Sequence, residues 1–248
     1  MNPIRKLLIP MIAAGAALFV LLNLGFWQLD RLAWKERLIA QVEEGITKEP
    51  VAAPVPSQWK EISAADDYRR VRVRGRFLEG VAFYYVALTK PTGDYGGPGV
   101  FAYAPFRTEE GWTVLLNRGF LPQDLPEDRR GRALVPPEGE IEVTGLLRLS
   151  EKPNWTTPEP DLGKNLWFAR DTEAMGAALG LDANELAPYS IDLDADFTPP
   201  GGLPEAGETI VRFKNDHLGY ALTWFGLAAT LIGVFLTYAA SVLWPRKH

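Results

Sequence analysis

The sequence lacks cysteine altogether and contains two histidines, His217 and His248, among its 248 residues. Without cysteine, the chain cannot form disulfide bonds, thiolate metal sites or thiol redox centres, and thiol-based delivery of copper is excluded. With so few histidines, a zinc or copper ion held only by this chain is excluded in almost every form. The two histidines are 31 residues apart, about 45 Å along a continuous helix, so they cannot bind the same metal ion.

An excess of positive charge is also missing, because 26 lysines and arginines stand against 31 acidic residues and the formal net charge is −5. A nucleic-acid partner is therefore not expected, since such proteins carry a basic stripe. The segment between residues 30 and 216 holds no histidine and no cysteine. The nucleophile systems that pair serine or cysteine with histidine are thus unavailable in it, and we expect a protein that is not an enzyme.

Two long stretches carry no charge, residues 7–29 and residues 218–244. Both exceed the ~20 apolar residues that a helix needs to cross a bilayer, and they predict two transmembrane helices. A cleaved signal peptide is the alternative for the first stretch, but no small-residue cleavage pattern follows it, which favours a retained anchor. The predicted organisation is a tail of residues 1–6, a helix of residues 7–29, a domain of residues 30–216, a helix of residues 217–244 and a tail of residues 245–248.

The charges that flank the first span leave the orientation of the chain open. Arg5 and Lys6 precede this span, whereas Arg31, Lys35 and Arg37 follow it. Long loops also cross a membrane largely regardless of their charge. Two spans place both termini on one side of the bilayer, and the residues alone are compatible with either side.

The segment between the spans is predicted to form a β-rich domain. Residues 70–77 alternate strictly between arginines and smaller or apolar residues, and residues 140–149 also alternate, which is typical of half-buried strands. Further elements are expected as strands at 81–88, 100–106, 111–117 and 209–213, and as one short helix at 172–179 with Asp171 as its N-cap. Frequent turns between short strands favour an antiparallel barrel or sandwich.

His217 is the first candidate functional residue, because it would lie in the first turn of the second span behind Asn215 as N-cap. The positive end of the helix dipole disfavours a charged imidazole there, and a neutral imidazole is the form that binds metal. The alternative is a histidine that only makes a hydrogen bond at the membrane interface. A haem held by His217 would take its second axial ligand from water, another residue type or another chain.

Trp27, Arg31 and Trp34 form the second candidate, because they share one helical stripe if the first span continues beyond Leu29. An arginine between two indoles could hold a carboxylate, such as a haem propionate, with support from cation–π contacts. The alternative is an ordinary aromatic belt at the membrane surface with a cation that extends toward water.

Small residues recur along the second span with spacings of four and three, and they form a continuous seam: Gly219, Thr223, Gly226, Thr230, Gly233 and Thr237. Such seams let helix backbones approach closely in lipid. We therefore predict that this seam packs on the small residues 13–17 of the first span. His217 would then lie about 160° away on the helix, since each residue advances by about 100°, and would face outward with Trp224, Ala228 and Phe235.

Three segments resemble the motifs of the surfeit-locus-one family of cytochrome c oxidase assembly factors. They are residues 25–35 (GFWQLDRLAWK), residues 117–122 (NRGFLP) and residues 215–225 (NDHLGYALTWF). In the middle segment, Phe120 stands where tryptophan is common in the family. The resemblance covers nearly the whole chain in the same order and topology.

The resemblance implies a non-enzymatic haem chaperone that assists insertion of haem a, its transient cargo, into the oxidase large subunit. It implies that His217 is the axial ligand of the haem iron, and the helical stripe then makes Arg31 the candidate partner of a propionate. The rings that would surround the haem are those of Trp27, Trp34, Tyr220 and Trp224. The expected partners are the large subunit, the enzymes of haem a biosynthesis and the lipid bilayer. A cofactor-free scaffold that holds an assembly intermediate through the β-rich domain is the alternative, and a haem-modifying enzyme is disfavoured by the single usable histidine.

The resemblance also implies that the β-rich domain lies on the periplasmic or intermembrane-space side and that both termini are cytoplasmic or matrix-facing. Six residues precede the first span, which leaves no room for a mitochondrial transit peptide. We therefore expect a multi-pass protein of a bacterial inner membrane, with two spans, a periplasmic domain and cytoplasmic termini.

Overall fold

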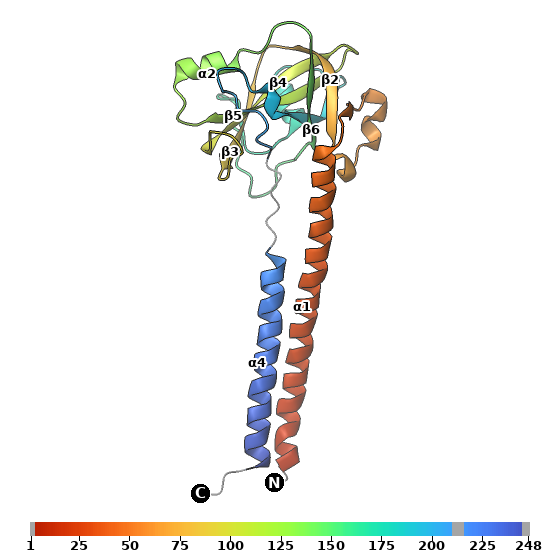
Figure 1. Ribbon diagram of the computed structural model, residues 1–248, viewed down its shortest axis with the longest axis vertical. Coiled ribbons are helices and arrows are strands. Elements are labelled where there is room, and N and C mark those ends of the chain that lie inside the picture. The colour runs from red at the N-terminus through yellow and green to blue at the C-terminus, as the bar shows by residue number, and fades with distance from the viewer. Residues whose placement is uncertain (1–2, 210–215, 245–248) are drawn as a thin grey trace. The chain divides into compact units, whose positions relative to one another are not determined.

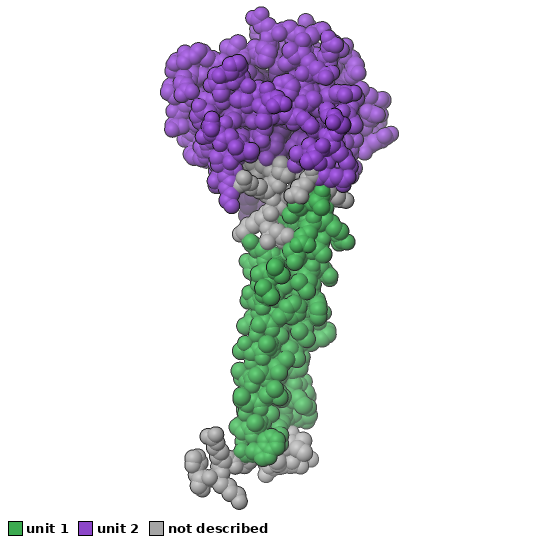
Figure 2. Space-filling view, in the orientation of Figure 1, with its two compact units in different colours: residues 1–41, 212–248 green, residues 42–211 purple. Residues whose placement is uncertain are grey.

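The computed structural model describes residues 3–209 and 216–244 (Figure 1). The chain divides into two compact units (Figure 2). The helical unit comprises residues 1–41 and 212–248, and the β unit comprises residues 42–211.

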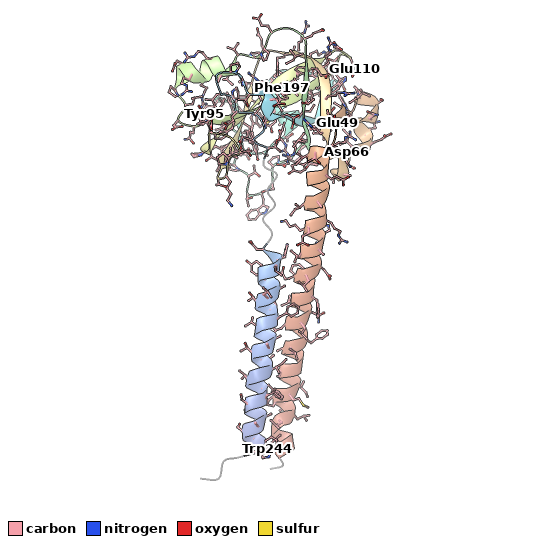
Figure 3. The ribbon with its side chains drawn as sticks, in the orientation of Figure 1. Glu49, Asp66, Tyr95, Glu110, Phe197 and Trp244 are labelled. Atoms are coloured by element: carbon pink, nitrogen blue, oxygen red, sulfur yellow. The ribbon has the colours of Figure 1, made fainter. Side chains whose placement is uncertain are left out.

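Two long helices run antiparallel and side by side in the helical unit, α1 (Pro3–Thr47) and α4 (His217–Leu243) (Figure 1). Their segments Leu7–Arg37 and His217–Leu243 are long and apolar enough to cross a membrane, so two membrane helices flank the β unit in sequence, as predicted. Trp244 follows the C-terminal end of α4 (Figure 3). Helix α1 continues far beyond Leu29 because the residues that follow are mostly good helix formers, without proline before Pro50.

The two helices meet through residues spaced alternately by four and three positions, the pattern of a coiled coil. Partly or fully buried residues in this pattern on α1 are Ala14, Leu18, Leu21, Gly25 and Gln28. Those on α4 are His217, Ala221, Trp224, Ala228, Leu231 and Phe235. The closest approach is at Gly25, where an added Cβ would lie 2.6 Å from the Phe225 ring. Bulky rings and leucines therefore pack the helices, with glycine or alanine opposite them.

The predicted small-residue seam does not face α1, so that prediction is wrong. A Cβ added to Gly219, Gly226 or Gly233 would meet no atom outside its own helix turn within 4 Å. Thr223 and Thr230 are exposed and donate their hydroxyls to carbonyls of their own helix. The opposite face packs on α1 instead, because Trp224, Leu231 and Phe235 there offer more area for van der Waals contact than glycine and threonine do.

The β unit contains one mixed sheet of eight strands in the order β1-β2-β6-β8-β5-β4-β3-β7. The strands are β1 (Val51–Ala52), β2 (Arg70–Phe77), β3 (Ala82–Leu88), β4 (Gly97–Thr108), β5 (Thr113–Pro122), β6 (Ile141–Leu149), β7 (Leu166–Trp167) and β8 (Leu186–Leu193). Strand β2 also pairs with β4, so β2, β6, β8, β5 and β4 close a ring. The fold is therefore a barrel rather than a sandwich.

Short helices connect the strands of the barrel. They are the α-helices α2 (Glu127–Leu134) and α3 (Thr172–Ala178) and the 3₁₀ turns η1 (Pro56–Glu61), η2 (Ala64–Asp66) and η3 (Ala195–Phe197). The predicted helix at 172–179 is confirmed as α3, and the Asp171 carboxylate accepts the backbone N–H of Ala174 at 3.2 Å. The predicted N-cap Asn215 and most of the predicted strand at 209–213 lie outside the described residues.

The strand predictions hold best where one face of the strand is polar. Residues 70–77 form β2 as predicted, and β6 and β3 agree within one residue of the predicted segments. Strands β4 and β5 are longer than predicted. The barrel strands pair antiparallel as predicted, except that β5 pairs with β8 in parallel. The long crossover between them, which includes β6 and α3, permits this parallel pairing.

The core of the barrel is built from both faces of β5. Val114 and Leu116 point into one cluster with Val71, Leu147 and Ile191, and Phe197 packs against its edge (Figure 3). Leu115, between them in sequence, points into a second cluster covered by α3 through Met175. Because both faces are buried, β5 shows no alternation of polar and apolar residues.

Candidate functional site

His217, the first residue of α4, faces α1 and contacts Gln28. Its Nδ1 atom lies 2.6 Å from Gln28 Oε1, and Gln28 is 9% exposed. The predicted outward orientation of His217 is therefore wrong. The physical reason is the spacing described above, because His217 occupies the first α1-facing position in the same series as Ala221 and Ala228.

The contact with Gln28 indicates which ring nitrogen of His217 carries the proton. An amide oxygen only accepts hydrogen bonds, so the contact requires the proton on Nδ1. A neutral ring of this tautomer carries its lone pair on Nε2, and no polar partner of Nε2 is found among the described residues. Histidines that bind metals through one nitrogen commonly donate the other N–H to an oxygen. The ring thus has the arrangement of a metal-ligating histidine.

Arg31 lies between two indoles, as the helical stripe predicts. Its guanidinium carbon is 5.7 Å from the centroid of Trp27 and 5.8 Å from that of Trp34. Both rings are about half exposed, and no carboxylate within the described ranges forms an ion pair with Arg31. Its N–H donors are therefore available to an anion, and the flanking rings hold the side chain by cation–π attraction.

The remaining predicted residues lie on α4 near His217. Trp224 is partly buried on the α1-facing series, two turns from His217, whereas Tyr220 is 56% exposed. The structure brings together His217 and Gln28, with Arg31 one turn further along α1. Gln28 is absent from the predicted site residues, although an amide at the end of an apolar run is a recognisable signal, since polar residues inside spans are costly.

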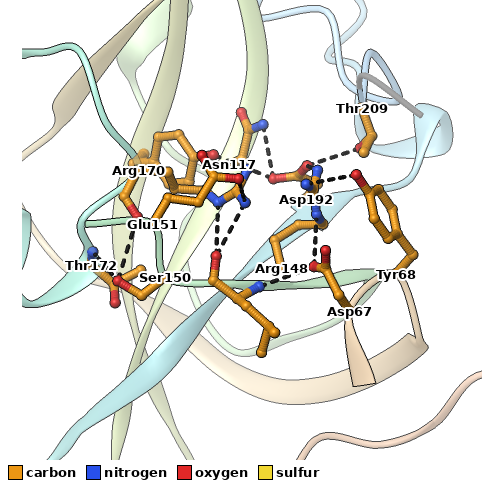
Figure 4. Close-up of polar contacts among 12 residues, drawn as sticks. Asp67, Tyr68, Asn117, Arg148, Ser150, Glu151, Arg170, Thr172, Asp192 and Thr209 are labelled. Atoms are coloured by element: carbon orange, nitrogen blue, oxygen red, sulfur yellow. Dashed lines mark hydrogen bonds and ion pairs between the residues drawn. The ribbon is translucent and has the colours of Figure 1, made fainter. Parts of the chain in front are cut away.

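A second polar cluster lies inside the β unit around Arg148 (Figure 4). Arg148 donates to Asp67 at 3.1 Å, to the Tyr68 hydroxyl at 3.0 Å and to Asp192 at 3.4 Å. Burial alone would lower the pKa of Arg148, but Asp192 and Asp67 hold that pKa above its usual value. Asp192 also accepts from Asn117 at 3.0 Å. These groups are paired with one another, which indicates a structural role.

The middle motif, residues 117–122, belongs to this structural framework. Asn117 accepts the backbone N–H of Gly119 at 3.0 Å while donating to Asp192. Gly119 has a φ of +128°, and a Cβ there would collide with the backbone of Glu205. Arg118 donates to carbonyls at the C-terminal end of α2, including Leu134 O at 2.7 Å. The motif therefore stabilises the barrel.

The β unit also contains an open apolar pocket of about 800 Å³. Aromatic residues Phe83, Tyr85 and Phe168 line it, and Arg130 and Lys164 contribute positive charge. Arg130 stacks on Phe83 with its guanidinium carbon 5.9 Å from the ring centroid. No predicted site residue lies in this pocket.

Metal ligands of the usual protein types do not cluster in the described part of the chain, where no group of three or more histidine, aspartate or glutamate side chains could hold an ion. A metal ion at His217 would therefore need its other ligands from outside the described residues.

The structure defines a protein with two antiparallel membrane helices and a closed β-barrel unit between them in sequence. The chain belongs to the SURF1 family, whose sequence model matches residues 15–229. It is 37% identical to Surfeit locus protein 1 of Gallus gallus over 238 residues, which cover 90% of this chain and 70% of the relative. It is 36% identical to Surfeit locus protein 1 of Homo sapiens, with 97% of this chain and 75% of the relative covered. The family is known for cytochrome c oxidase assembly factors, so the predicted family is confirmed.

A third relative widens this comparison beyond vertebrates. The SURF1-like protein of Drosophila melanogaster is 32% identical over 239 residues, which cover 91% of this chain and 73% of the relative. The three matches each cover 90% or more of this chain, which is more than the β unit alone. The similarity therefore applies to the whole architecture and not to one unit alone.

Proposed function

We propose that this protein assists the assembly of cytochrome c oxidase by holding haem a at His217 before the haem enters the large subunit. Membership of the SURF1 family supports the role in oxidase assembly. The observation that carries the haem part is the ring of His217, whose Nδ1 is engaged by Gln28 while Nε2 has no described partner. The role is non-enzymatic, and the enzymes that make haem a would supply the cargo.

The residues near His217 fit a haem. The iron supplies the site for an axial nitrogen, and the neutral imidazole offers Nε2 as that ligand. Arg31 presents N–H donors that suit a propionate carboxylate. The half-exposed rings of Trp27 and Trp34 and the more exposed Tyr220 offer flat apolar surface, and Trp224 adds a partly buried ring on the side of His217.

The proposal includes an arrangement in the membrane. Two spans return the chain to the side on which it began, so both termini share one side and the β unit lies on the other. We assign the β unit to the periplasmic side of a bacterial inner membrane, as the family resemblance implies. A single cysteine at Trp155, which is 96% exposed, should react with a membrane-impermeant maleimide in intact spheroplasts. Labelling only after the membrane is disrupted would contradict this orientation.

A cofactor-free scaffold is the second candidate, and the open pocket of the β unit favours it. Its aromatic lining, with Arg130 at the rim, could receive an apolar side chain of an assembly intermediate. In that case the oxidase subunit would bind through the β unit, and His217 would serve only the packing of α1 and α4.

Visible absorption of the purified protein separates the two candidates. The chain is co-produced with the enzymes of haem a biosynthesis, and the spectrum of the purified protein is compared with those of His217→Ala and His248→Ala. We expect haem absorption in the wild type and in His248→Ala and its loss in His217→Ala. Arg31→Ala should insert normally into the membrane but retain haem less well. A wild type without haem, or His217→Ala with an unchanged spectrum, would reject the haem role.

A further inference from the structure

Gln28 is a buried amide with one hydrogen-bond partner among the described residues. It lies in the apolar part of α1, is 9% exposed and contacts His217 at 2.6 Å. An amide that is buried without a hydrogen bond costs several kcal/mol, about 2–7 depending on the reference state. The contact with His217 therefore stabilises both side chains at the interface.

We propose that Gln28 is the positioning residue of His217. Its carbonyl oxygen holds the proton on Nδ1 and fixes the plane of the ring, so that Nε2 stays available as a ligand. The effect on haem binding rests on the proposed function, whereas the tautomer of His217 is a property of the protein without haem. A hydrogen-bond partner on the second nitrogen of a metal-ligating histidine fixes the orientation of the ring and raises its basicity.

The packing of the two helices brings Gln28 within reach of His217. One turn before Gln28, Gly25 lies against the ring of Phe225 so closely that a Cβ would not fit. The adjacent Phe26 ring meets Phe225 edge-on, with centroids 5.4 Å apart. This approach of the backbones lets an uncharged side chain of glutamine length span the gap. The pose of the histidine therefore depends on α1 and α4 together.

Glutamine suits this position better than its neighbours in size and polarity. A leucine would leave Nδ1 without an acceptor and the ring free to turn. A glutamate would accept the same hydrogen bond but would place a carboxylate in the span, which is costly. Glutamate thus supplies a variant that restores the acceptor, and leucine supplies one that removes it.

The tautomer of His217 can be read without haem. The chain has two histidines, so His248→Gln leaves one, and a purification tag without histidine keeps it so. In ¹⁵N-histidine-labelled protein in lipid nanodiscs, we expect Nδ1 to give the signal of a protonated nitrogen and Nε2 that of an unprotonated one. Gln28→Leu should mix or reverse the two signals, and Gln28→Glu should restore them.

Asn23→Leu is the matched control, because Asn23 is also an amide of α1 but is exposed and donates to Phe19 O at 2.8 Å. This variant should leave the His217 signals unchanged. The inference is overturned if the wild type carries its proton on Nε2. It is also overturned if Gln28→Leu keeps the wild-type pattern, or if Asn23→Leu alters the signals as Gln28→Leu does.

The haem-loaded protein gives a second readout. Gln28→Leu should lower haem affinity by about 10–100-fold, the usual effect of removing a group behind a metal ligand, and should lower the iron–histidine stretching frequency. Gln28→Glu should recover both. If His217→Ala still binds haem, while the wild type and the Gln28 variants show the expected His217 signals, the proposed function fails and the positioning role of Gln28 stands. If His217→Ala loses haem but Gln28→Leu changes neither readout, the positioning role fails alone.

Discussion

The two units of the molecule treat buried polar groups differently. In the β unit, Arg148 has three hydrogen-bond acceptors and stacks on Tyr68 with 4.0 Å to the ring centroid. In the helical unit, Gln28 and His217 share one contact, and the second ring nitrogen has no partner among the described residues. Removal of one charged member of the Arg148 cluster would leave a buried charge unpaired, which is costly. The second ring nitrogen of His217 is not tied into such a cluster and stays accessible to a further group.

The largest expected effect tests the paired cluster. Arg148→Leu leaves Asp192, which is 3% exposed, without its cation. Breaking a buried pair from one side costs about 3–5 kcal/mol, and we expect the free energy of unfolding of the β unit to fall by that amount. Denaturant unfolding followed by near-ultraviolet circular dichroism measures this loss.

Arg132→Leu is the control for Arg148→Leu, because its ion pair with Asp128 is solvent-exposed on both sides. Exposed pairs of this kind contribute less than about 1 kcal/mol. Equal losses in the two variants would show that pairing inside the barrel does not set its stability, and the contrast between the units would fail.

A smaller effect is expected from the helix interface. Gly25→Leu forces a side chain into the Phe225 ring, and overpacking of this kind costs about 1–3 kcal/mol. Gly15→Leu is the matched control, because a Cβ at Gly15 meets nothing within 4 Å. Cysteines placed at Leu18 and Ala228, in a chain that otherwise has none, should cross-link less in Gly25→Leu and normally in Gly15→Leu. Phe225→Ala should recover the cross-link, and equal yields in both glycine variants would contradict the packing.

The smallest effect, counted per pH unit and per tyrosine, is a loss of stability of the β unit at alkaline pH. Burial raises the pKa of Tyr103 well above 10.0 and also raises the pKa of Tyr189. Both rings stay neutral in the folded state, whereas unfolded tyrosine ionises near pH 10. Their contribution is complete below pH 10 and declines above it by about 1.4 kcal/mol per pH unit for each tyrosine.

The tyrosinate absorbance that belongs to Tyr103 and Tyr189 should therefore appear only together with unfolding above pH 10, after the exposed tyrosines have titrated. Tyr103→Phe should make the loss of stability with pH less steep. Titration of all tyrosines near pH 10 without unfolding would contradict the burial of these two hydroxyls.

The sequence predicted the elements whose pattern is local. The arginine alternation of β2 and the Asp171 cap of α3 each depend on a few neighbouring residues, and both are confirmed. Strand β8 was not predicted, because its residues are buried almost throughout and contain both Asp192 and Ser190. Asp192 has its partners Asn117 and Arg148 far along the chain, which no local period reveals. The same holds for the closure of the barrel by β2 and β4.

The sequence predicted which histidine belongs to the candidate site, but it did not predict how that side chain is oriented. His217 follows from the count of histidines and the family motif, but its orientation depends on which face of α4 meets α1. The small-residue seam suggested the wrong face, since the heptad series with Trp224 and Phe235 competes with it on the same helix. Gln28 joins the site only once it is known which face of α4 packs on α1, because its partner His217 lies 189 residues away.

This separation along the chain sets an order of events during synthesis. Ribosomes add roughly 5–20 residues per second, so the 189 residues between Gln28 and His217 take about 10–40 seconds to make at that rate. During this time α1 is in the bilayer without α4, and the whole β unit is synthesised and can fold. The histidine meets its glutamine only after the β unit has been synthesised. A molecule that presents the His217 ring correctly therefore already contains its barrel segment, and the contact distinguishes it from shorter nascent chains.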